Sequence, residues 1–277
     1  MSGNSLGSPV AAARQKLQAV APRAHVPYSK TNEAVLLLFD DGQWIPGVRV
    51  ESASFSLSLS ALANAYTTAA TLGRDARIVA VVASHSLRTE EEQYVELLPL
   101  SLSKRAPDLH VHTSIDTEMA LPLPTAAASP YLDASISSPS QGVALARDVA
   151  GRAVVPISDF TVGAVLETNQ GQLIPGANVE HSDWARIVCA ERNALGTWRS
   201  YDGSSVQALY LSCPLDPQGT PCGACRQWLA ELAPEITIWM DRGDASPLAT
   251  SPGDLLPGSF TGEALPHSGP TPDDATS

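Results

Sequence analysis

The residues best suited to chemistry lie in the C-terminal half of the chain: one glutamate, Glu191, and four cysteines, Cys189, Cys213, Cys222 and Cys225. Cys222 and Cys225 form a Cys-x-x-Cys at the start of a predicted helix. Backbone N–H groups and the positive helix end lower thiol pKa values there, and the spacing puts two thiolates on one side of a metal ion. A third thiolate from Cys189 leaves the fourth tetrahedral position of a zinc ion open for water. Three protein ligands plus water are typical of catalytic zinc, whereas four protein ligands are typical of structural zinc.

Glu191 is predicted to transfer protons, because it lies beside a metal ligand and is not needed as one. Zinc lowers the pKa of its bound water towards about 7, so hydroxide is available at neutral pH. A carboxylate next to that water accepts the proton and delivers it to the substrate.

Three other uses of the cysteines stay open at this point: two disulfides, a closed structural zinc site with Cys213 as fourth ligand, and a redox-active Cys-x-x-Cys. Two cysteines only three positions apart in an expected intracellular chain disfavour disulfides. A redox pair leaves Cys189 and Glu191 unexplained. Cys213 ends an apolar run, which favours a buried free thiol. Catalytic zinc is therefore the main hypothesis.

The composition restricts what such a site acts on. The chain has 277 residues, 44% of them hydrophobic, and a formal charge of −12 from 17 basic and 29 acidic residues. This supplies a core but disfavours nucleic acid, whose phosphates are bound by an excess of Lys and Arg. The sequence has neither an apolar run of about 18 residues nor a secretory h-region near its N-terminus. We expect a cytoplasmic protein with a small-molecule substrate and no membrane or nucleic-acid partner.

The sequence contains an internal duplication. A shift of 129 positions aligns 20–65 with 149–194 without a gap, and 18 of the 46 aligned positions are identical, where chance gives about three. The motif Gly-Gln-x-Ile-Pro-Gly occurs at 42–47 and again at 171–176, so Ala-rich composition does not explain the match. We therefore predict four parts: a domain over 1–122, a linker over 123–141, a domain over 142–262 and a disordered tail over 263–277.

The second copy shows which elements position the candidate residues. Hydrophobic patterns and turn residues predict, in order, helix 142–153, hairpin strands 160–167 and 172–178, helix 185–199, strand 206–213, helix 223–233 and strand 236–240. A hairpin followed by helix, strand, helix and strand is typical of a three-layer α/β domain, and the duplication predicts two of them.

Five motifs of the second copy, in this order, resemble the cytidine deaminase family of zinc-dependent deaminases. Residues 156–164 (Pro-Ile-Ser-Asp-Phe-Thr-Val-Gly-Ala) are similar to its Pro-Tyr-Ser-x-Phe-x-Val-Gly-Ala, and 178–181 (Asn-Val-Glu-His) to its Asn-Val-Glu-Asn. Residues 189–192 (Cys-Ala-Glu-Arg) and 221–227 (Pro-Cys-Gly-Ala-Cys-Arg-Gln) match its two zinc motifs, and 255–260 (Leu-Leu-Pro-Gly-Ser-Phe) are similar to its Leu-Leu-Pro-x-x-Phe. The resemblance implies a duplicated three-layer α-β-α deaminase-like domain with a mixed sheet.

The resemblance also implies roles for single residues. It implies one zinc ion per chain, held by Cys189, Cys222 and Cys225, and a proton shuttle, Glu191, that also holds the protonated N3 of the base. It implies substrate contacts by Phe160 (near the pyrimidine), Asn178 and Glu180 (ribose hydroxyls), the backbone at Ala190 (base) and Phe260 (closing a pocket of a neighbouring domain). Arg192 has a physical reason of its own, because a guanidinium offsets the net −1 charge of zinc with three thiolates.

The chain departs from the family pattern at four positions, Ile157, Ala177, His181 and Trp184. These departures bear on substrate specificity, whereas the zinc ligands and the proton shuttle are intact. For His181 we favour a role in capping its loop over a contact with substrate.

The first copy lacks the catalytic residues. Ser60 stands opposite Cys189, Leu62 opposite Glu191, Ala63 opposite Arg192 and Arg49 opposite Asn178, whereas Glu51 is kept opposite Glu180. Residues 99–103, which contain no thiol, are aligned with 221–225. We predict a catalytically inactive domain. Family members with one live and one degenerate copy form dimers that imitate a tetramer of single domains, so the resemblance implies a homodimer with two zinc ions.

The predicted reaction is hydrolytic deamination of cytidine, and of 2′-deoxycytidine, to the uridine product and ammonia, as in pyrimidine salvage. Three alternatives are deamination of another aminopyrimidine nucleoside such as blasticidin S, a non-catalytic nucleoside-binding module, and editing of single-stranded RNA or DNA. The intact ribose motif at 178–180 disfavours the first, and the intact Glu191 disfavours the second. The third lacks the positive groove and stacking aromatics that such binding uses.

Overall fold

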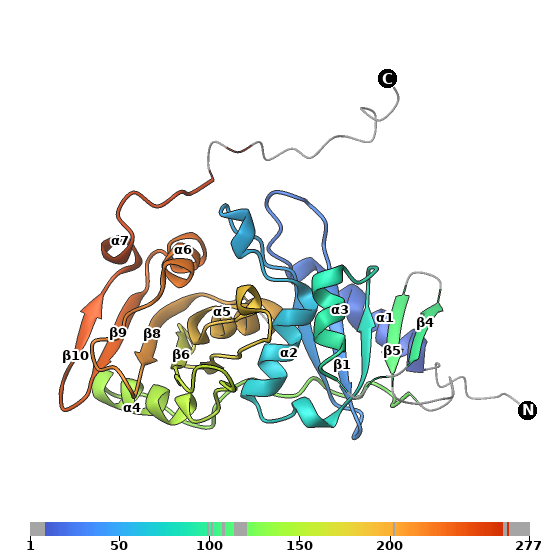
Figure 1. Ribbon diagram of the computed structural model, residues 1–277, viewed down its shortest axis with the longest axis horizontal. Coiled ribbons are helices and arrows are strands. Elements are labelled where there is room, and N and C mark those ends of the chain that lie inside the picture. The colour runs from blue at the N-terminus through green and yellow to red at the C-terminus, as the bar shows by residue number, and fades with distance from the viewer. Residues whose placement is uncertain are drawn as a thin grey trace, which may run out of the picture.

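The structure is a computed structural model that describes residues 9–98, 100, 102–106, 109–113, 121–201, 203–262 and 265. Two α/β units lie side by side along its long axis, the first formed by the N-terminal half of the chain and the second by the C-terminal half (Figure 1). The predicted α/β fold class is therefore confirmed. The tail predicted to be disordered, 263–277, lies outside the described residues apart from Leu265. None of the described helices has the length and apolar character that a bilayer crossing requires.

The C-terminal domain has three layers around a five-stranded mixed sheet. Strands β8 and β9 run parallel and the other neighbours antiparallel, in the order β10-β9-β8-β6-β7. Helix α4 packs on the face with Val165 and Tyr210, and α5 on the face with Ala164 and Leu211. The strands are β6 (Gly163–Thr168), β7 (Leu173–Ala177), β8 (Val206–Ser212), β9 (Thr237–Arg242) and β10 (Ala245–Thr250). The helices are α4 (Pro139–Ala150), α5 (Ala190–Tyr201), α6 (Gly223–Leu232) and α7 (Pro252–Leu255).

The N-terminal domain repeats this plan with a different sheet. Its order is β2-β1-β3-β5-β4, and every described strand pair is antiparallel. In the C-terminal domain α6 carries the chain back so that β9 lies parallel to β8, whereas here the chain forms a β4–β5 hairpin whose second strand pairs with β3. The mixed sheet is thus present in one copy only. The strands are β1 (Ala34–Phe39), β2 (Trp44–Val48), β3 (Ile78–Ala83), β4 (Leu102–Ala106) and β5 (Leu109–Thr113), and the helices are α1 (Pro9–Val20), α2 (Ala61–Thr71) and α3 (Thr89–Val95).

The structure corrects the alignment of 99–103 with the Cys-x-x-Cys. Helix α3 follows β3 as α6 follows β8, whereas Leu102 and Ser103 belong to β4. Arg88 therefore takes the N-cap position that Cys222 has on α6, and Glu91 takes the position of Cys225, three residues later. The connection before α3 (84–88) is shorter than the one before α6 (213–222), so the residues equivalent to 221–225 lie at 87–91, well before 99–103.

The predicted helix over 185–199 is wrong at its beginning, because α5 starts only at Ala190. Asp183 caps a separate 3₁₀ turn, Trp184–Arg186, by accepting the Ala185 N–H. Val188 is then held extended by two backbone hydrogen bonds with Val179. Cys189 consequently stands directly before the first turn of α5.

Two asparagines at equivalent positions join the domains where α2 packs against α5. Asn64 is fully buried and donates to the carbonyls of Val48 in its own domain and Gly196 in the other. Asn193 does the reverse, donating to Ala177 in its own domain and Thr67 in the other. Between them the equivalent hydroxyls of Thr68 and Thr197 are 2.7 Å apart. The two copies therefore meet about a local two-fold axis.

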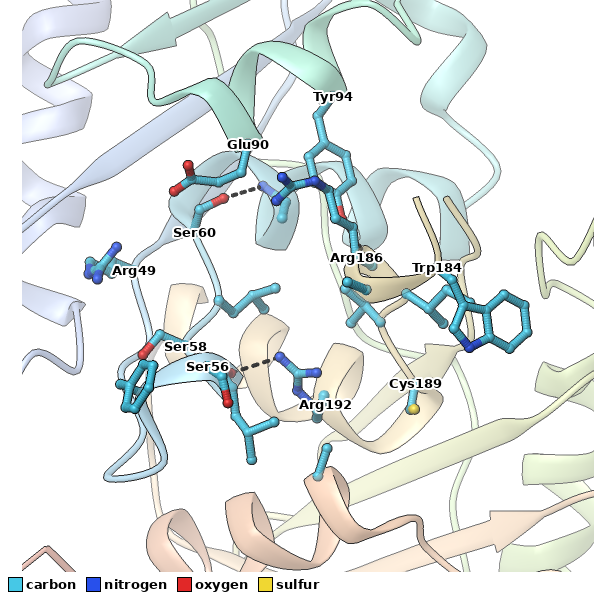
Figure 2. A pocket seen from close by; sticks show the side chains of 18 of the residues that line it. Arg49, Ser56, Ser58, Ser60, Glu90, Tyr94, Trp184, Arg186, Cys189 and Arg192 are labelled. Atoms are coloured by element: carbon cyan, nitrogen blue, oxygen red, sulfur yellow. Dashed lines mark hydrogen bonds between the residues drawn. The ribbon is translucent and has the colours of Figure 1, made fainter. Parts of the chain in front are cut away.

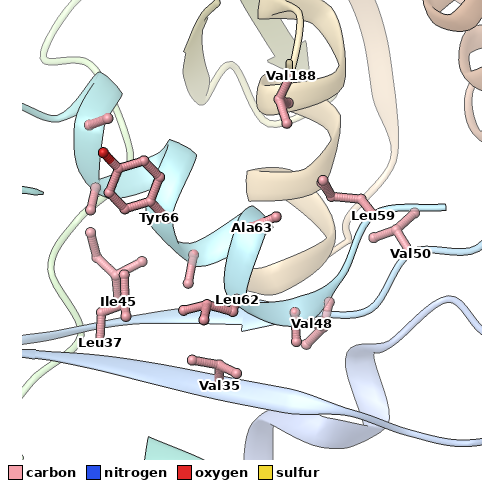
Figure 3. Close-up of a cluster of buried hydrophobic side chains, with 14 of the residues drawn as sticks. Val35, Leu37, Ile45, Val48, Val50, Leu59, Leu62, Ala63, Tyr66 and Val188 are labelled. Atoms are coloured by element: carbon pink, nitrogen blue, oxygen red, sulfur yellow. The ribbon is translucent and has the colours of Figure 1, made fainter. Parts of the chain in front are cut away.

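One hydrophobic core runs through both domains. In Figure 3, Val188 of the C-terminal domain points towards the same cluster as Leu59, Leu62 and Tyr66 of the N-terminal domain.

A close approach of helix to strand is built into each copy. A Cβ on Gly176 would come within 2.1 Å of the Ala190 carbonyl oxygen, and the corresponding contact involves Gly47. The glycine of the repeated motif thus lets α2 and α5 lie on their sheets.

The segment predicted as a linker, 123–141, contacts both domains. Ala128 donates its N–H to the Trp44 carbonyl in the N-terminal domain, and Leu132 donates to the Leu173 carbonyl in the C-terminal domain. Helix α4 begins within this segment, at Pro139, with Ser138 as its N-cap.

Candidate metal centre and active site

Three cysteines meet where two helices begin. Cys222 is the N-cap of α6, Cys225 lies in its first turn, and Cys189 precedes α5. Their Sγ atoms all lie within 4.8 Å of one another, with 3.7 Å between Cys189 and Cys222 and 3.5 Å between Cys222 and Cys225. Tetrahedral zinc with Zn–S bonds of about 2.3 Å places its thiolates about 3.8 Å apart. The three side chains therefore fit a zinc ion.

Cys213 does not belong to this cluster, and all four cysteines are free thiols. Burial raises the pKa of Cys213 to about 12, and the charge of Glu191 adds to the rise. Hydrogen bonds with Cys189 and Cys225, together with the N–H groups of the α6 first turn, lower the pKa of Cys222. This geometry supports a metal site with three thiolates. It supports neither disulfides nor a zinc site with four cysteines.

Glu191 is the second residue of α5 and is only 3% exposed. Burial raises the pKa of its carboxyl to about 7, and the negative charge of Cys222 adds to that rise. Its side chain lines the same cavity as Cys189 and Cys222. The carboxyl and two of the three clustered thiols therefore line one cavity.

This cavity has a volume of about 560 Å³, within the range of about 300–1,000 Å³ common for small-ligand sites. Three of the predicted substrate contacts, Phe160, Asn178 and Glu180, line it together with Glu191. The other lining residues are Ser158, Val162, Trp184, Ile187, Cys189, Cys213, Asp216, Gln218, Gly219, Thr220 and Cys222.

Asn178 and Glu180 also organise the wall of the cavity. Asn178 accepts the Val162 N–H at 2.7 Å and donates to the Phe160 carbonyl at 2.8 Å, which keeps this stretch out of the sheet. This is why β6 begins at Gly163 and not at Phe160 as predicted. Each Asn178 amide atom retains capacity for one more hydrogen bond.

Glu180 accepts the N–H groups of Ile157 and Ser158. Glu51 accepts the corresponding N–H groups of Tyr28 and Ser29 in the N-terminal domain. The carboxylate at this position therefore has a structural role in both copies, and Glu180 alone borders the cavity beside Glu191.

Besides Cys225, three predicted residues lie outside the cavity lining. Ala190 is fully buried at the start of α5. Phe260 is 49% exposed, and its carbonyl accepts a hydrogen bond from Gln227. Two residues later the chain reaches the N-terminal domain, where a Cβ on Gly262 would come within 2.5 Å of the Tyr28 hydroxyl. Phe260 is therefore not among the residues that line the cavity next to the cysteines of the same chain.

Arg192, the third predicted residue outside that cavity, lines a second one of about 670 Å³ that also contains Cys189 and Cys222. It donates to the Leu57 carbonyl of the N-terminal domain at 2.8 Å, a bond drawn in Figure 2. Its guanidinium lies 4.9 Å from the centre of the Trp228 ring, and the Trp228 indole N–H donates to the same carbonyl. The N-terminal domain therefore orients the cation that sequence analysis placed beside the thiolates.

His181 caps its loop, since its Nδ1 accepts the Asp183 N–H at 2.9 Å.

Sequence analysis missed the other side of the cavity, formed by Asp216, Gln218, Gly219 and Thr220. The one available signal was position, because this Pro- and Gly-containing segment leads directly into the Cys-x-x-Cys.

Comparison with known proteins finds one family description twice in the chain. "Cytidine and deoxycytidylate deaminase zinc-binding region" matches residues 137–240 and residues 4–92. The chain is similar to the cytidine deaminase of Halalkalibacterium halodurans, with 40% identity over 116 residues that cover 41% of this chain and 86% of that protein. It is also similar to the cytidine deaminase of Mycobacterium tuberculosis, with 34% identity over 131 residues that cover 44% and 89%. Among solved structures, cytidine deaminase from Burkholderia pseudomallei matches with 34% identity and a TM-score of 0.41, over 44% of this chain and 98% of that one.

Proposed function

Because the chain belongs to the cytidine deaminase family, a family of zinc enzymes, we propose that its C-terminal domain, 142–262, hydrolyses the 4-amino group of both cytidine and 2′-deoxycytidine in pyrimidine salvage. The products are the corresponding uridine nucleoside and ammonia. The observation that carries this proposal is a cluster of three thiols, two of which line a cavity of nucleoside size together with one buried carboxyl.

Cys189, Cys222 and Cys225 would hold the zinc ion, which when bound supplies the Lewis acidity that lowers the pKa of a water molecule towards about 7. Glu191 has the role of proton carrier. Its carboxylate accepts one proton from the attacking water and delivers it to N3 of the pyrimidine as C4 becomes tetrahedral. It then takes the second proton from the hydroxyl now on C4 and passes it to the amino group, so that the C4–N bond breaks and ammonia leaves. The water oxygen stays on C4 as the carbonyl oxygen of the product.

The charge of the cavity supports a free nucleoside as the substrate. The charged side chains that line it are all acidic, namely Glu180, Glu191 and Asp216. A 5′-phosphate would be repelled there and would find no cation among the lining residues to bind it. The partly exposed Phe160 ring offers a face for the base, and the unused hydrogen-bonding capacity of Asn178 suits a ribose hydroxyl.

We assign the N-terminal domain, 1–122, no catalysis. Its Glu91, in the position of Cys225, accepts the backbone N–H of Leu62, which is in the position of Glu191. His85 lies 2.9 Å from the same carboxylate. A histidine–carboxylate contact therefore takes the space where the other copy gathers its thiols.

We also propose a homodimer with two zinc ions, located in the cytoplasm. Phe55 and Trp184 hold equivalent positions in the two copies, and both are strongly exposed, at 88% and 62%. Aromatic rings so exposed on one cavity rim suit an interface with a second copy. The four free thiols suit a reducing compartment. Sedimentation equilibrium of the zinc-loaded protein should give about twice the chain mass, and a single-chain mass would contradict the dimer.

The function is tested by ultraviolet absorbance of cytidine, and separately of 2′-deoxycytidine, mixed with the zinc-loaded protein. Both spectra should change to those of the uridine products. A change with cytidine alone would restrict the substrate to ribonucleosides. If neither spectrum changes while zinc stays bound, the proposed function is wrong.

A further inference from the structure

The N-terminal domain contacts a loop that forms one wall of the nucleoside cavity. This loop, residues 181–188, is called the rim loop here. It carries Trp184 and Ile187, both of which line the cavity. Inside the loop the hydrogen bonds are local, such as those from Asp183 N–H to His181 Nδ1 and from Arg186 N–H to the Asp183 carbonyl. These bonds shape the turn, and the two backbone hydrogen bonds between Val188 and Val179 hold only the C-terminal end of the loop.

One buried side chain of the other domain connects to the rim loop at two points. Tyr94, on α3, is 4% exposed and donates its hydroxyl to the Arg186 carbonyl at 2.8 Å. Its ring centre lies 5.1 Å from that of His181, the first residue of the loop. Figure 2 shows Tyr94 and Arg186 side by side above Trp184. The two contacts flank Trp184, and the one at Arg186 lies directly before Ile187.

Helix α3 is itself held firmly, so Tyr94 is a fixed support. The Glu91 carboxylate, one turn before Tyr94, accepts the N–H groups of Leu62 and Arg88 and is fully buried. The Tyr94 ring also packs against Tyr66 of α2, with 5.6 Å between ring centres. Helix α2 in turn packs on α5, which carries Glu191. Tyr94 thus links the rim loop to the same framework as the catalytic carboxyl.

From these contacts we infer that Tyr94 of the inactive domain is a positioning residue for the nucleoside pocket, holding Trp184 and Ile187 at the distance that suits a bound pyrimidine nucleoside. This inference rests on the proposed function. Tyr94 does not touch the reacting atoms, so it acts on binding and not on the chemical step. Its loss should raise KM while leaving kcat and the zinc content as they are.

The test is Tyr94→Phe, which removes the hydroxyl and keeps the ring against His181. KM for cytidine should rise about fivefold, the factor expected for one neutral hydrogen bond, with kcat within about twofold and one zinc ion per chain. The dissociation constant of the product uridine, measured by calorimetry without turnover, should rise by the same factor. Tyr94→Leu, which removes the ring as well, should raise both constants further.

The matched control is Tyr66→Phe, since Tyr66 belongs to the same ring pair and its hydroxyl makes no hydrogen bond to a described residue. It should leave KM unchanged. Equal KM values for wild type and Tyr94→Phe overturn the inference alone, as does a fall in kcat or zinc content that accompanies the rise in KM. A wild-type protein that binds zinc but does not convert cytidine overturns the proposed function, and this inference with it.

Discussion

Glu191→Gln should lower the turnover of cytidine by about 10²–10⁴-fold, the contribution typical of a positioned acid–base group. The amide has nearly the same shape as the carboxyl but cannot accept the proton of the attacking water. Because Glu191 is 3% exposed at the start of α5, the isosteric change should leave the packing intact. The measurement is the initial rate at saturating cytidine, with zinc determined by atomic absorption on the same samples.

The control for this experiment is Glu235→Gln, which makes the same chemical change at an exposed turn of the same domain. It should behave as the wild type. Near-normal turnover of Glu191→Gln would remove Glu191 as the proton carrier. A variant that has lost its zinc would mean that the carboxyl helps to hold the metal.

Cys222→Ala should reduce bound zinc from one ion per chain to less than about a tenth and destabilise the C-terminal domain. The affinity of a metal for a preformed site contributes to the free energy of folding, so losing a ligand lowers both. The Sγ atom of Cys222 lies 3.7 Å from that of Cys189 and 3.5 Å from that of Cys225. Removal of Cys222 leaves two of the three ligands. We expect a fall in the thermal midpoint of about 10 °C, corresponding to roughly 3 kcal/mol.

Cys213→Ala is the matched control, because it removes a thiol of the same domain that lies outside the cluster. It should keep its zinc and lose about 1 kcal/mol or less from the lost packing. The ligand assignment is contradicted by a Cys222→Ala protein with full zinc and an unchanged midpoint. It is equally contradicted if Cys213→Ala loses the metal instead.

The thiol cluster was predictable from the sequence because its information is local. A Cys-x-x-Cys at a helix start fixes the relation of Cys222 to Cys225 within one turn. The duplication supplied the domain plan, since eighteen shared residues in forty-six positions include the buried asparagines and the glycines under α2 and α5. These positions tolerate little change, so the match survived where the catalytic residues did not.

What escaped the sequence depends on contacts between distant segments. The beginning of α5 is set by the backbone pairing of Val188 with Val179, which a helical pattern does not report. The sheet of the N-terminal domain differs because β5 pairs antiparallel with β3. The equivalence of Glu91 with Cys225 becomes visible only after the helices are placed. The far wall of the cavity is an irregular loop with no periodicity. Tyr94 gives no signal at all, because its partner Arg186 is 92 positions away in the other copy.

The reciprocal asparagine contacts have a consequence for the history of the chain. Asn64 of the first copy contacts the second copy, and Asn193 of the second copy makes the equivalent contact with the first. Such an interface is self-complementary, which is the property that defines an isologous contact between identical subunits. A surface of this kind suits two separate, identical chains as well as the two halves of one chain. The fusion gives every molecule both sides of this contact. The first half of the chain keeps its side of the contact, although Ser60, Leu62 and Glu91 stand where the second half has Cys189, Glu191 and Cys225.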